Sequence, residues 1–452
     1  MRTLLLDDGD AFAPTRAAAL ARVAAIDPQA YARTRNALDG AVTRLSPYIT
    51  HGFVTLPEVA YRVASRHSLS VQHRLVFEWG WREYFRHVWQ MHGEGIFRSL
   101  HAGLLPDEAY ASDLPSDIRH ARTGVPVVDL SVRALYASGY LHNHARMWLA
   151  SYFVHVRKVH WRVGADWMLG HLLDGDLASN HLSWQWVAGA ASRKPYLFNA
   201  DNVARHAPAA WHSARTAIDA DYGALDALAR RPGAVPAGSA GRSEPVDAPA
   251  LLDTPPAADF ESPTAEQAQQ LLAGRDVWLV HPWALNDPPS DLAPGVLVLV
   301  VAPREFHARW PWSERRWSFV GARMRTLTPW RWCVDAPRLA QVLRAARSVQ
   351  TVDDAHIAAW WPPQVARRPA PSLFPCVNTP CDSFSRWWSR VTRGLQTMSE
   401  LPGLRACDDA TTKGDDHEHQ QRLALGGADG IVQDTADAAH GPGHRRARWH
   451  RP

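Results

Sequence analysis

The stretch "HLLDGDLASNHLSWQW" at 171–186 combines residue types that the packing of a hydrophobic core does not require. Two carboxylates, Asp174 and Asp176, stand close to the amide Asn180 and to two tryptophans. A helix cap explains part of the pattern, because Asp is common at helix starts. An acid/base pair, a ligand contact or a sugar-cleaving carboxylate pair would explain it as well. A metal site is the weakest interpretation, because no further ligand follows at a suitable spacing.

The same mixture of aromatic and charged residues recurs upstream of this stretch. The chain has 21 Trp, and several of them stand near Glu, Arg or Asn in otherwise apolar segments. A single Trp is more often a core residue than a ligand contact. Buried charges, however, need a partner or a ligand. The whole set therefore predicts a helical domain that holds a large polar and aromatic cofactor.

The chain has 452 residues, which are too many for one ordinary domain. Its composition and the periodicity of its apolar residues change along the chain. Apolar residues recur with helical spacing through 1–210. Residues 211–270 are rich in Pro, Ala, Gly and Ser, which predicts a linker with little fixed structure. Strand-like runs then alternate with helical segments over 271–395, which predicts a small parallel-sheet domain with a terminal helix at 383–392. Residues 396–452 are mostly polar, and we expect them to be disordered.

Charge, cysteines and apolar runs indicate the compartment. The net charge of +4 permits an acidic partner without requiring one. The 4 cysteines form neither a metal-ligand pattern nor a disulfide framework, which favours a reducing cytoplasm. Asp7 and Asp8 interrupt any apolar core of a signal peptide, and the longest apolar run, 295–302, is too short to cross a bilayer. We expect a soluble, cytoplasmic monomer without a membrane partner.

Four motifs in a fixed order carry a family resemblance. They are "YARTRNALDGAVTRLSPYITHG" at 31–52, "FEWGWREYFRHV" at 77–88, the helical run at 123–167 and "DGDLASNHLSWQW" at 174–186. In this order they resemble the flavin-phosphate segment, the Trp-Arg-Glu helix, the central helices and the flavin cradle of the photolyase/cryptochrome family. A lone Asp-Gly-Asp would be a weak sign, whereas the ordered set is specific. The sugar-cleaving interpretation explains none of the other three motifs.

The resemblance implies a mostly α-helical FAD-binding domain and a smaller C-terminal α/β, Rossmann-like domain. Arg146 and Asp174 would pair beside the isoalloxazine, Asp176 would hydrogen-bond the cofactor, and Asn180 would face flavin N5. Backbone N–H groups at a helix start suit a diphosphate. The cofactor contacts that the resemblance assigns are Tyr31, Thr43, Arg44, Leu45, Ser46, Arg82, Arg146, Asp174, Asp176 and Asn180.

The resemblance also implies UV-damaged DNA as a partner, bound independently of its sequence. Aromatic faces would stack on a flipped-out lesion, and Glu78 and Asn143 would hydrogen-bond its base edges. Because neither Asn143 nor Met147 is a histidine, we expect the cyclobutane dimer to be the substrate rather than the (6-4) lesion. The expected catalytic residues are Glu78, Asn143, Trp161 and Trp184, and the expected substrate contacts are Arg35, Trp81, Met147 and Trp186.

Two departures from the family pattern keep a second function open. Trp184 and Trp161 match two members of the family's electron relay, but residues 97–110, where the distal Trp is expected, contain none. Tyr110 is a candidate exit. The α/β unit resembles the antenna domain that normally comes first, yet it follows the helical domain, and whether it binds an antenna chromophore stays open.

The expected function is blue-light-driven splitting of cyclobutane pyrimidine dimers by a deoxyribodipyrimidine photo-lyase that uses reduced FAD. The alternative is a cryptochrome-like photoreceptor that binds FAD and repairs nothing. The retained stacking residues favour the enzyme, because a sensor has no need of them. A light-independent flavoprotein is the weakest of the three hypotheses.

Overall fold

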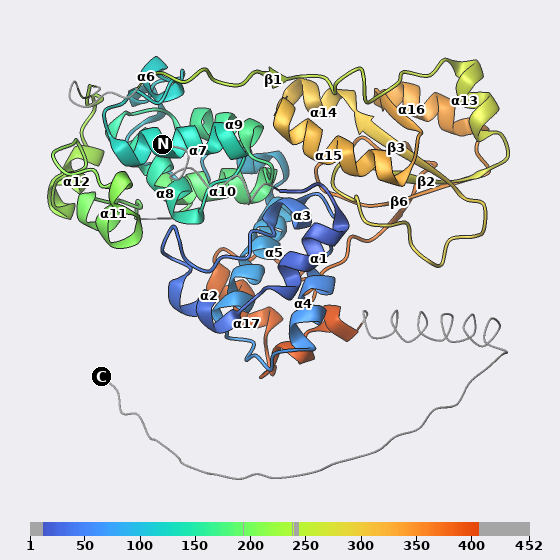
Figure 1. The fold of residues 1–452 in the computed structure, drawn as a ribbon, viewed down its shortest axis with the longest axis horizontal. Coiled ribbons are helices and arrows are strands. Elements are labelled where there is room, and N and C mark those ends of the chain that lie inside the picture. Colours follow the sequence, from blue (N-terminus) through green and yellow to red (C-terminus); the bar gives the residue numbers. More distant parts are fainter. Residues whose placement is uncertain (1–11, 193, 237, 239–243, 406–452) are drawn as a thin grey trace, which may run out of the picture. The chain divides into compact units, whose positions relative to one another are not determined.

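The computed structural model describes residues 12–192, 194–236, 238 and 244–405. Helices dominate up to about residue 230 and most of the strands come after residue 270 (Figure 1). The helices are α1 (Arg16–Ala24), α2 (Pro28–Thr34), α3 (Ser46–Thr50), α4 (Leu56–Ala64), α5 (Arg74–His92), α6 (Ser116–Arg119), α7 (Pro126–Ser138), α8 (Asn143–Ser151), α9 (Trp161–His171), α10 (Leu177–Ala188), α11 (Ala200–His206), α12 (Tyr222–Ala229), α13 (Ala265–Leu272), α14 (Arg304–Arg309), α15 (Glu314–Leu327), α16 (Ala336–Val342) and α17 (Phe384–Val391). The strands are β1 (Leu251–Leu252), β2 (Asp276–Val280), β3 (Leu297–Pro303), β4 (Trp312–Ser313), β5 (Arg331–Val334), β6 (Ser348–Val352) and β7 (Ala366–Arg368).

Local sequence signals fix the ends of α7 and α10, and α10 directly follows the predicted carboxylates. α7 has Pro126 in its first turn, where the missing N–H costs nothing, and Gly139 follows its end with a φ of 68°. α10 begins after Asp176, whose side chain accepts a hydrogen bond from the backbone N–H of Ser179. Gly189, with a φ of 79°, follows the end of α10. The helix-cap interpretation of Asp176 is therefore confirmed.

Five strands form one parallel sheet in the order β5-β3-β2-β6-β7. β2 starts the sheet, β3 and β5 extend it on one side, and β6 and β7 extend it on the other. The strand order therefore reverses between β2 and β6, which is the crevice where open α/β sheets bind ligands. The predicted C-terminal α/β domain is confirmed, and its crevice lies at residues 281–283 and 353–356, just after these two strands.

The segment 211–270 contains more structure than the predicted linker. It includes α12 and β1, and β1 pairs antiparallel with β4, with Leu251 opposite Ser313. The sequence did not indicate this pairing, because the surrounding residues are rich in Pro and Ala. A two-residue strand also has no periodicity of its own. The described residues fall in one compact unit, so the domain boundaries at 210 and 270 stay predictions.

The end of the described chain packs back on its beginning. Orange α17 lies among the blue helices α4 and α5 in Figure 1. The predicted terminal helix is thus present. Residues 396–405 are also ordered, with Met398, Leu401 and Leu404 buried, so the tail predicted to be disordered is folded in this part. The rest of that tail, 406–452, lies outside the described residues.

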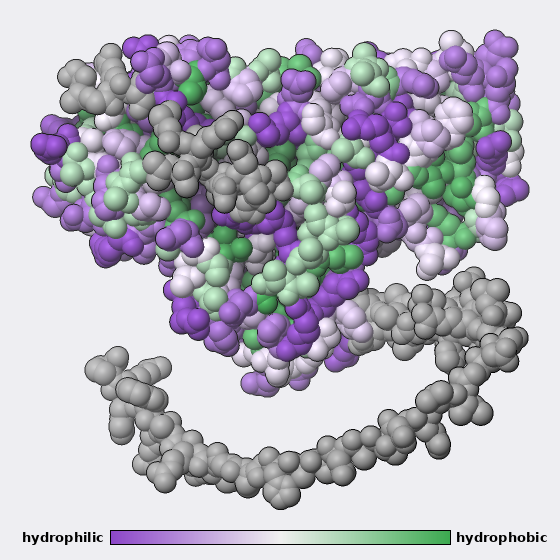
Figure 2. Space-filling model, viewed as in Figure 1, coloured by the Kyte–Doolittle hydropathy of each residue, from purple (hydrophilic) through white to green (hydrophobic). Residues whose placement is uncertain are grey.

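The face of the described part that is drawn in Figure 2 carries many hydrophilic residues. Figure 2 shows hydrophilic residues over most of one face, with hydrophobic residues gathered near β2. None of the helices in the described ranges is long and apolar enough to cross a membrane. Cys333, Cys376 and Cys381, the described cysteines, are free thiols.

Gly80 of α5 lies against the indole of Trp388 of α17. A Cβ at this position would lie 2.4 Å from Cζ3 of Trp388. We expect Gly80→Ala to lower the free energy of unfolding by about 1–3 kcal/mol, because the indole must move. Denaturant unfolding measures this change. Gly95→Ala is the control, because a Cβ at Gly95 would lie 3.6 Å from its nearest neighbour, Cβ of His92, which is an ordinary contact distance. Equal stabilities for the two variants would contradict this packing.

Candidate functional site

The loop between α9 and α10 places both predicted carboxylates inside the protein. Asp174 is 7% exposed and Asp176 is 3% exposed. Side chains from other elements hold the backbone of this loop. His51 Nε2 lies 2.9 Å from the carbonyl oxygen of Leu173, and Arg316 Nη2 donates to the carbonyl oxygen of Gly175 at 2.6 Å. The positions of the two carboxylates therefore depend on side chains from outside the loop.

Asp174 forms an ion pair with Arg146 of α8. Nη2 of Arg146 lies 3.0 Å and 2.8 Å from the two carboxylate oxygens. Burial raises the pKa of Asp174, but the charge and hydrogen bonds of Arg146 outweigh it, so the pKa falls below its usual value. The structure thus contains the ion pair that the resemblance implied. Its role beside a flavin stays a prediction.

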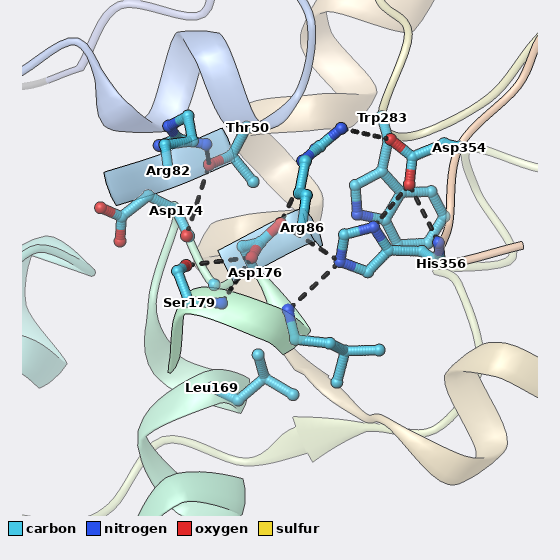
Figure 3. Close-up of polar contacts among 12 residues, drawn as sticks. Thr50, Arg82, Arg86, Leu169, Asp174, Asp176, Ser179, Trp283, Asp354 and His356 are labelled. Carbon is cyan, nitrogen blue, oxygen red and sulfur yellow. Dashed lines mark hydrogen bonds and ion pairs between the residues drawn. The ribbon is translucent and has the colours of Figure 1, made fainter. Parts of the chain in front are cut away.

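Asp176 forms hydrogen bonds through only one of its two carboxylate oxygens within the described part of the chain, and the other takes part in longer ion pairs (Figure 3). Oδ1 accepts hydrogen bonds from the backbone N–H and the hydroxyl of Ser179, at 2.8 Å and 3.0 Å. Oδ2 is buried and has no hydrogen-bond partner among the described residues. Arg86 Nη2 and His356 Nε2 each lie 3.7 Å from it. Burial raises the pKa of Asp176, but the neighbouring basic side chains have a larger, opposite effect. The pKa of this carboxyl therefore lies below its usual value.

Arg82 supplies spare donors next to this acceptor. Its Nη1 donates to Thr50 Oγ1 at 3.1 Å, the one hydrogen bond it makes within the described part of the chain. Burial lowers the pKa of Arg82, while the charge of Asp176 acts to raise it. A guanidinium has five N–H donors. A buried acceptor without a hydrogen-bond donor and a half-buried cation with unused donors together fit a polar ligand that offers both kinds of group, as FAD does.

The other predicted cofactor residues lie around α2, α3 and α10. Thr43 to Ser46 form the turn that enters α3, and Arg44 adopts a positive φ of 49° there. The Ser46 hydroxyl hydrogen-bonds Asp174 and helps to lower the pKa of that carboxyl. Leu45 is buried, and burial raises the pKa of Tyr31 on α2. Asn180 Nδ2 donates to the carbonyl of Ala165 at 2.8 Å. Their contacts with FAD stay predictions.

Two pairs of predicted substrate residues are in contact. Arg35 Nε lies 3.4 Å from Oε1 of Glu78, and burial nevertheless raises the pKa of Glu78. Asn143 Nδ2 lies 3.4 Å from Sδ of Met147, one turn further along α8, and Asn143 is exposed. The structure therefore brings the predicted polar contacts together in pairs.

The predicted stacking tryptophans differ in accessibility. One face of Trp81 is covered by Phe384 of α17, with ring centroids 4.0 Å apart and planes 10° from parallel. Trp186 is 41% exposed near the end of α10 and lies 5.6 Å from the ring of Tyr196. Sequence reasoning did not foresee the contact of α17 with Trp81, because the two segments are far apart in the chain.

The predicted relay residues are both buried. Trp184 is 2% exposed and Trp161 is 4% exposed. The ring of His160 lies 5.7 Å from that of Trp161 and 6.2 Å from that of Tyr110. The ring of His160 thus lies between those of Tyr110 and Trp161, and the role of Tyr110 as an electron exit stays a prediction.

Four residues of the site escaped the sequence analysis: Arg86, Arg316, Asp354 and His356. Arg86 follows Arg82 by four residues on α5, so helical spacing would have placed both on one face. Its Nη1 lies 3.4 Å from Asp354, and the positive charges around Asp354 hold its pKa well below the usual value despite burial. The other three come from the α/β domain, and no local pattern connects them with the helical part.

The comparisons with known proteins agree with this site. The family model described as "FAD binding domain of DNA photolyase" matches residues 75–212. A deoxyribodipyrimidine photo-lyase of Streptomyces griseus is 35% identical over 159 residues, 34% of this chain and 33% of that protein. A cryptochrome DASH of Idiomarina loihiensis is 32% identical over 170 residues, 36% of this chain and 38% of that protein. A solved Synechocystis cryptochrome is 28% identical, with 45% of this chain and 44% of that chain covered and a TM-score of 0.40.

Residues 75–212 are therefore a photolyase-type FAD-binding domain, and this part of the chain is similar to members of the photolyase/cryptochrome family. The chain spans between a third and two fifths of the length of these two curated relatives. FAD is the cofactor of this domain. The relatives include a photo-lyase and a cryptochrome, so the family alone does not assign repair or photoreception.

The Arg146–Asp174 pair gives a test of the cofactor site. We expect Arg146→Met to lower the free energy of unfolding by about 3 kcal/mol, because it leaves a buried carboxylate unpaired. FAD should also be lost on purification. Because the pKa of Asp174 is lowered in the folded state, the pair stabilises the protein above the unfolded pKa. Its contribution disappears as the pH falls through the folded pKa, so the stabilities of wild type and variant should converge in acid.

Arg157→Met is the matched control. Arg157 pairs with Asp117 away from the site, and the side chains in that pair are 10% and 21% exposed. This variant should lose stability while keeping its FAD. Unfolding curves and the FAD content of the purified proteins measure both properties. Equal FAD loss in the two variants would show that the Arg146–Asp174 pair has no special connection with the cofactor.

Proposed function

We propose that this protein is a blue-light-driven DNA repair flavoenzyme that splits cyclobutane pyrimidine dimers. The observation that carries the proposal is the arrangement of α10. Asp176 and Asn180 stand at its first turns in the buried cofactor site, and Trp186, 41% exposed, stands near its other end. One short helix therefore connects the cofactor with an aromatic face that an extruded base can stack on.

The side chains of this chain would bind and orient the reactants. When bound, reduced FAD supplies the light-driven electron that splits the dimer. Arg82, Arg146 and Asp176 would hold the cofactor, with Arg146 fixed by Asp174. Trp186 would stack on the lesion, and Glu78 and Asn143 would hydrogen-bond its base edges. Burial raises the pKa of Glu78, and its carboxyl oxygens can accept hydrogen bonds from a base edge.

The cofactor must be reduced before it can act. Trp184 and Trp161 would carry electrons to it from the surface. Because residues 97–110 contain no Trp, we assign the outer step to Tyr110, which contacts Trp161 through His160. A weak relay would slow photoreduction and would leave the repair step itself intact.

The deciding experiment is repair of a cyclobutane thymine dimer in a short single-stranded oligonucleotide. The protein is reduced chemically beforehand, so that the relay does not affect the result. We expect dimer to disappear under blue light and to persist in the dark. No loss of dimer from protein that holds reduced FAD would refute the repair function.

Trp186 tests the proposed stacking face. Trp186→Ala should weaken binding of dimer-containing DNA by about 10- to 100-fold, because stacking of a base on an aromatic ring is worth about 1–3 kcal/mol. Trp330→Ala is the matched control, since Trp330 is 40% exposed and lies in the α/β domain. Fluorescence titration measures the dissociation constants. Equal weakening by the two substitutions would place the lesion elsewhere.

A photoreceptor without repair activity is the second candidate function. Phe384 covers one face of Trp81, so only one of the two predicted stacking tryptophans is largely exposed. The absence of a Trp from residues 97–110 also favours photoreception over repair. If protein that holds FAD fails to repair the dimer, photoreception becomes the favoured function.

A further inference from the structure

The crevice of the parallel sheet is filled by the helical part of the chain. It lies after β2 and β6, where sheets of this topology bind ligands. In this chain Trp283, after β2, and His356, after β6, stack on each other with ring centroids 4.7 Å apart and planes 10° from parallel. Arg86 of α5 enters the same place and pairs with Asp354 at 3.4 Å (Figure 3). The position at which sheets of this topology bind ligands is thus occupied here by contacts between the α/β domain and the helical domain.

The imidazole of His356 is fixed in one orientation and one tautomer. Its Nδ1 lies 2.6 Å from Oδ1 of Asp354, so Nδ1 carries the proton and donates it. Trp283 covers one face of the ring, and Trp89 meets it edge-on at 5.0 Å. Nε2 is therefore left as an acceptor.

That acceptor caps α10. The backbone N–H of Leu177, the first residue of the helix, donates to His356 Nε2 at 3.2 Å. The N–H of Ser179 donates to Oδ1 of Asp176. The first N–H groups of a helix lack partners within it, so each needs an outside acceptor. Because His356 accepts from the N–H of Leu177, Asp176 needs only one oxygen for the N–H of Ser179, and its buried Oδ2 makes no hydrogen bond among the described residues.

We propose that the C-terminal α/β domain is part of the cofactor site: His356, held by Asp354, is a positioning residue that caps α10 and so reserves Oδ2 of Asp176 for FAD. The inference rests on the proposed function only in taking FAD as the ligand. It assigns to this domain a role in binding the flavin of the helical domain, independent of any antenna chromophore.

The test compares three full-length variants. His356→Leu removes the acceptor at similar volume, and His356→Gln offers an amide oxygen in its place. Thr351→Val is the matched control, because it removes a buried hydrogen bond to Leu279 in the same domain without touching α10. FAD affinity is measured by titration of the apoprotein, and hydrogen exchange is measured over residues 173–180 in the absence of FAD.

We expect His356→Leu to weaken FAD binding by about five- to tenfold, which is the loss that a missing helix cap typically causes. Exchange of the Leu177 amide should become about tenfold faster. His356→Gln should restore most of both, and Thr351→Val should change neither.

The outcomes separate this inference from the proposed function. FAD affinity and exchange that are the same in His356→Leu as in Thr351→Val would overturn the inference and leave the repair function standing. If His356→Gln behaves like His356→Leu, the acceptor is not what matters, and the inference fails as well. If the wild-type protein binds no FAD, the proposed function and the cofactor role both fail, while the exchange data still decide whether His356 caps α10.

Discussion

The buried guanidinium of Arg316 is the constraint on which the site depends. It has no accessible surface and forms no ion pair with a carboxylate of the described residues, and burial lowers its pKa to about 9. Its charge is stabilised by the carbonyl groups of Leu169 and Gly175 and by the face of Trp312, which lies 3.7 Å away. A buried cation with fewer partners would be costly. The loop that carries Asp174 and Asp176 can therefore take this shape only when the α/β domain is folded against it.

The site is consequently built from two distant parts of the chain. Residues between 31 and 186 supply the groups expected to face the cofactor, and residues between 281 and 356 hold those groups in place. His51 shows the same dependence: its Nδ1 lies 2.5 Å from the carbonyl of Pro282, and its Nε2 faces the loop. The α/β domain follows the helical domain in this chain, yet the contacts make it a structural partner of the flavin site.

Local sequence patterns made part of the fold and of the site predictable. Asp176 and Gly189 carry strong cap signals, and the apolar runs at β2 and β3 showed the parallel sheet. Motif resemblance placed Arg146 opposite Asp174, which the structure confirms as an ion pair. The contacts of His356 with Leu177 could not be foreseen, because they join segments that no helical or strand period connects. The same reason explains the unforeseen covering of Trp81 by α17.

The charged groups of the site are matched in sign. Four guanidiniums, Arg82, Arg86, Arg146 and Arg316, interact with four carboxylates, Glu83, Asp174, Asp176 and Asp354. Attraction between opposite charges is strong where the dielectric constant is low, so this matched set stabilises the shape of the buried loop. Such a site would serve repair and photoreception equally. What separates the two is whether a base stacks on the partly exposed ring of Trp186, near the other end of α10.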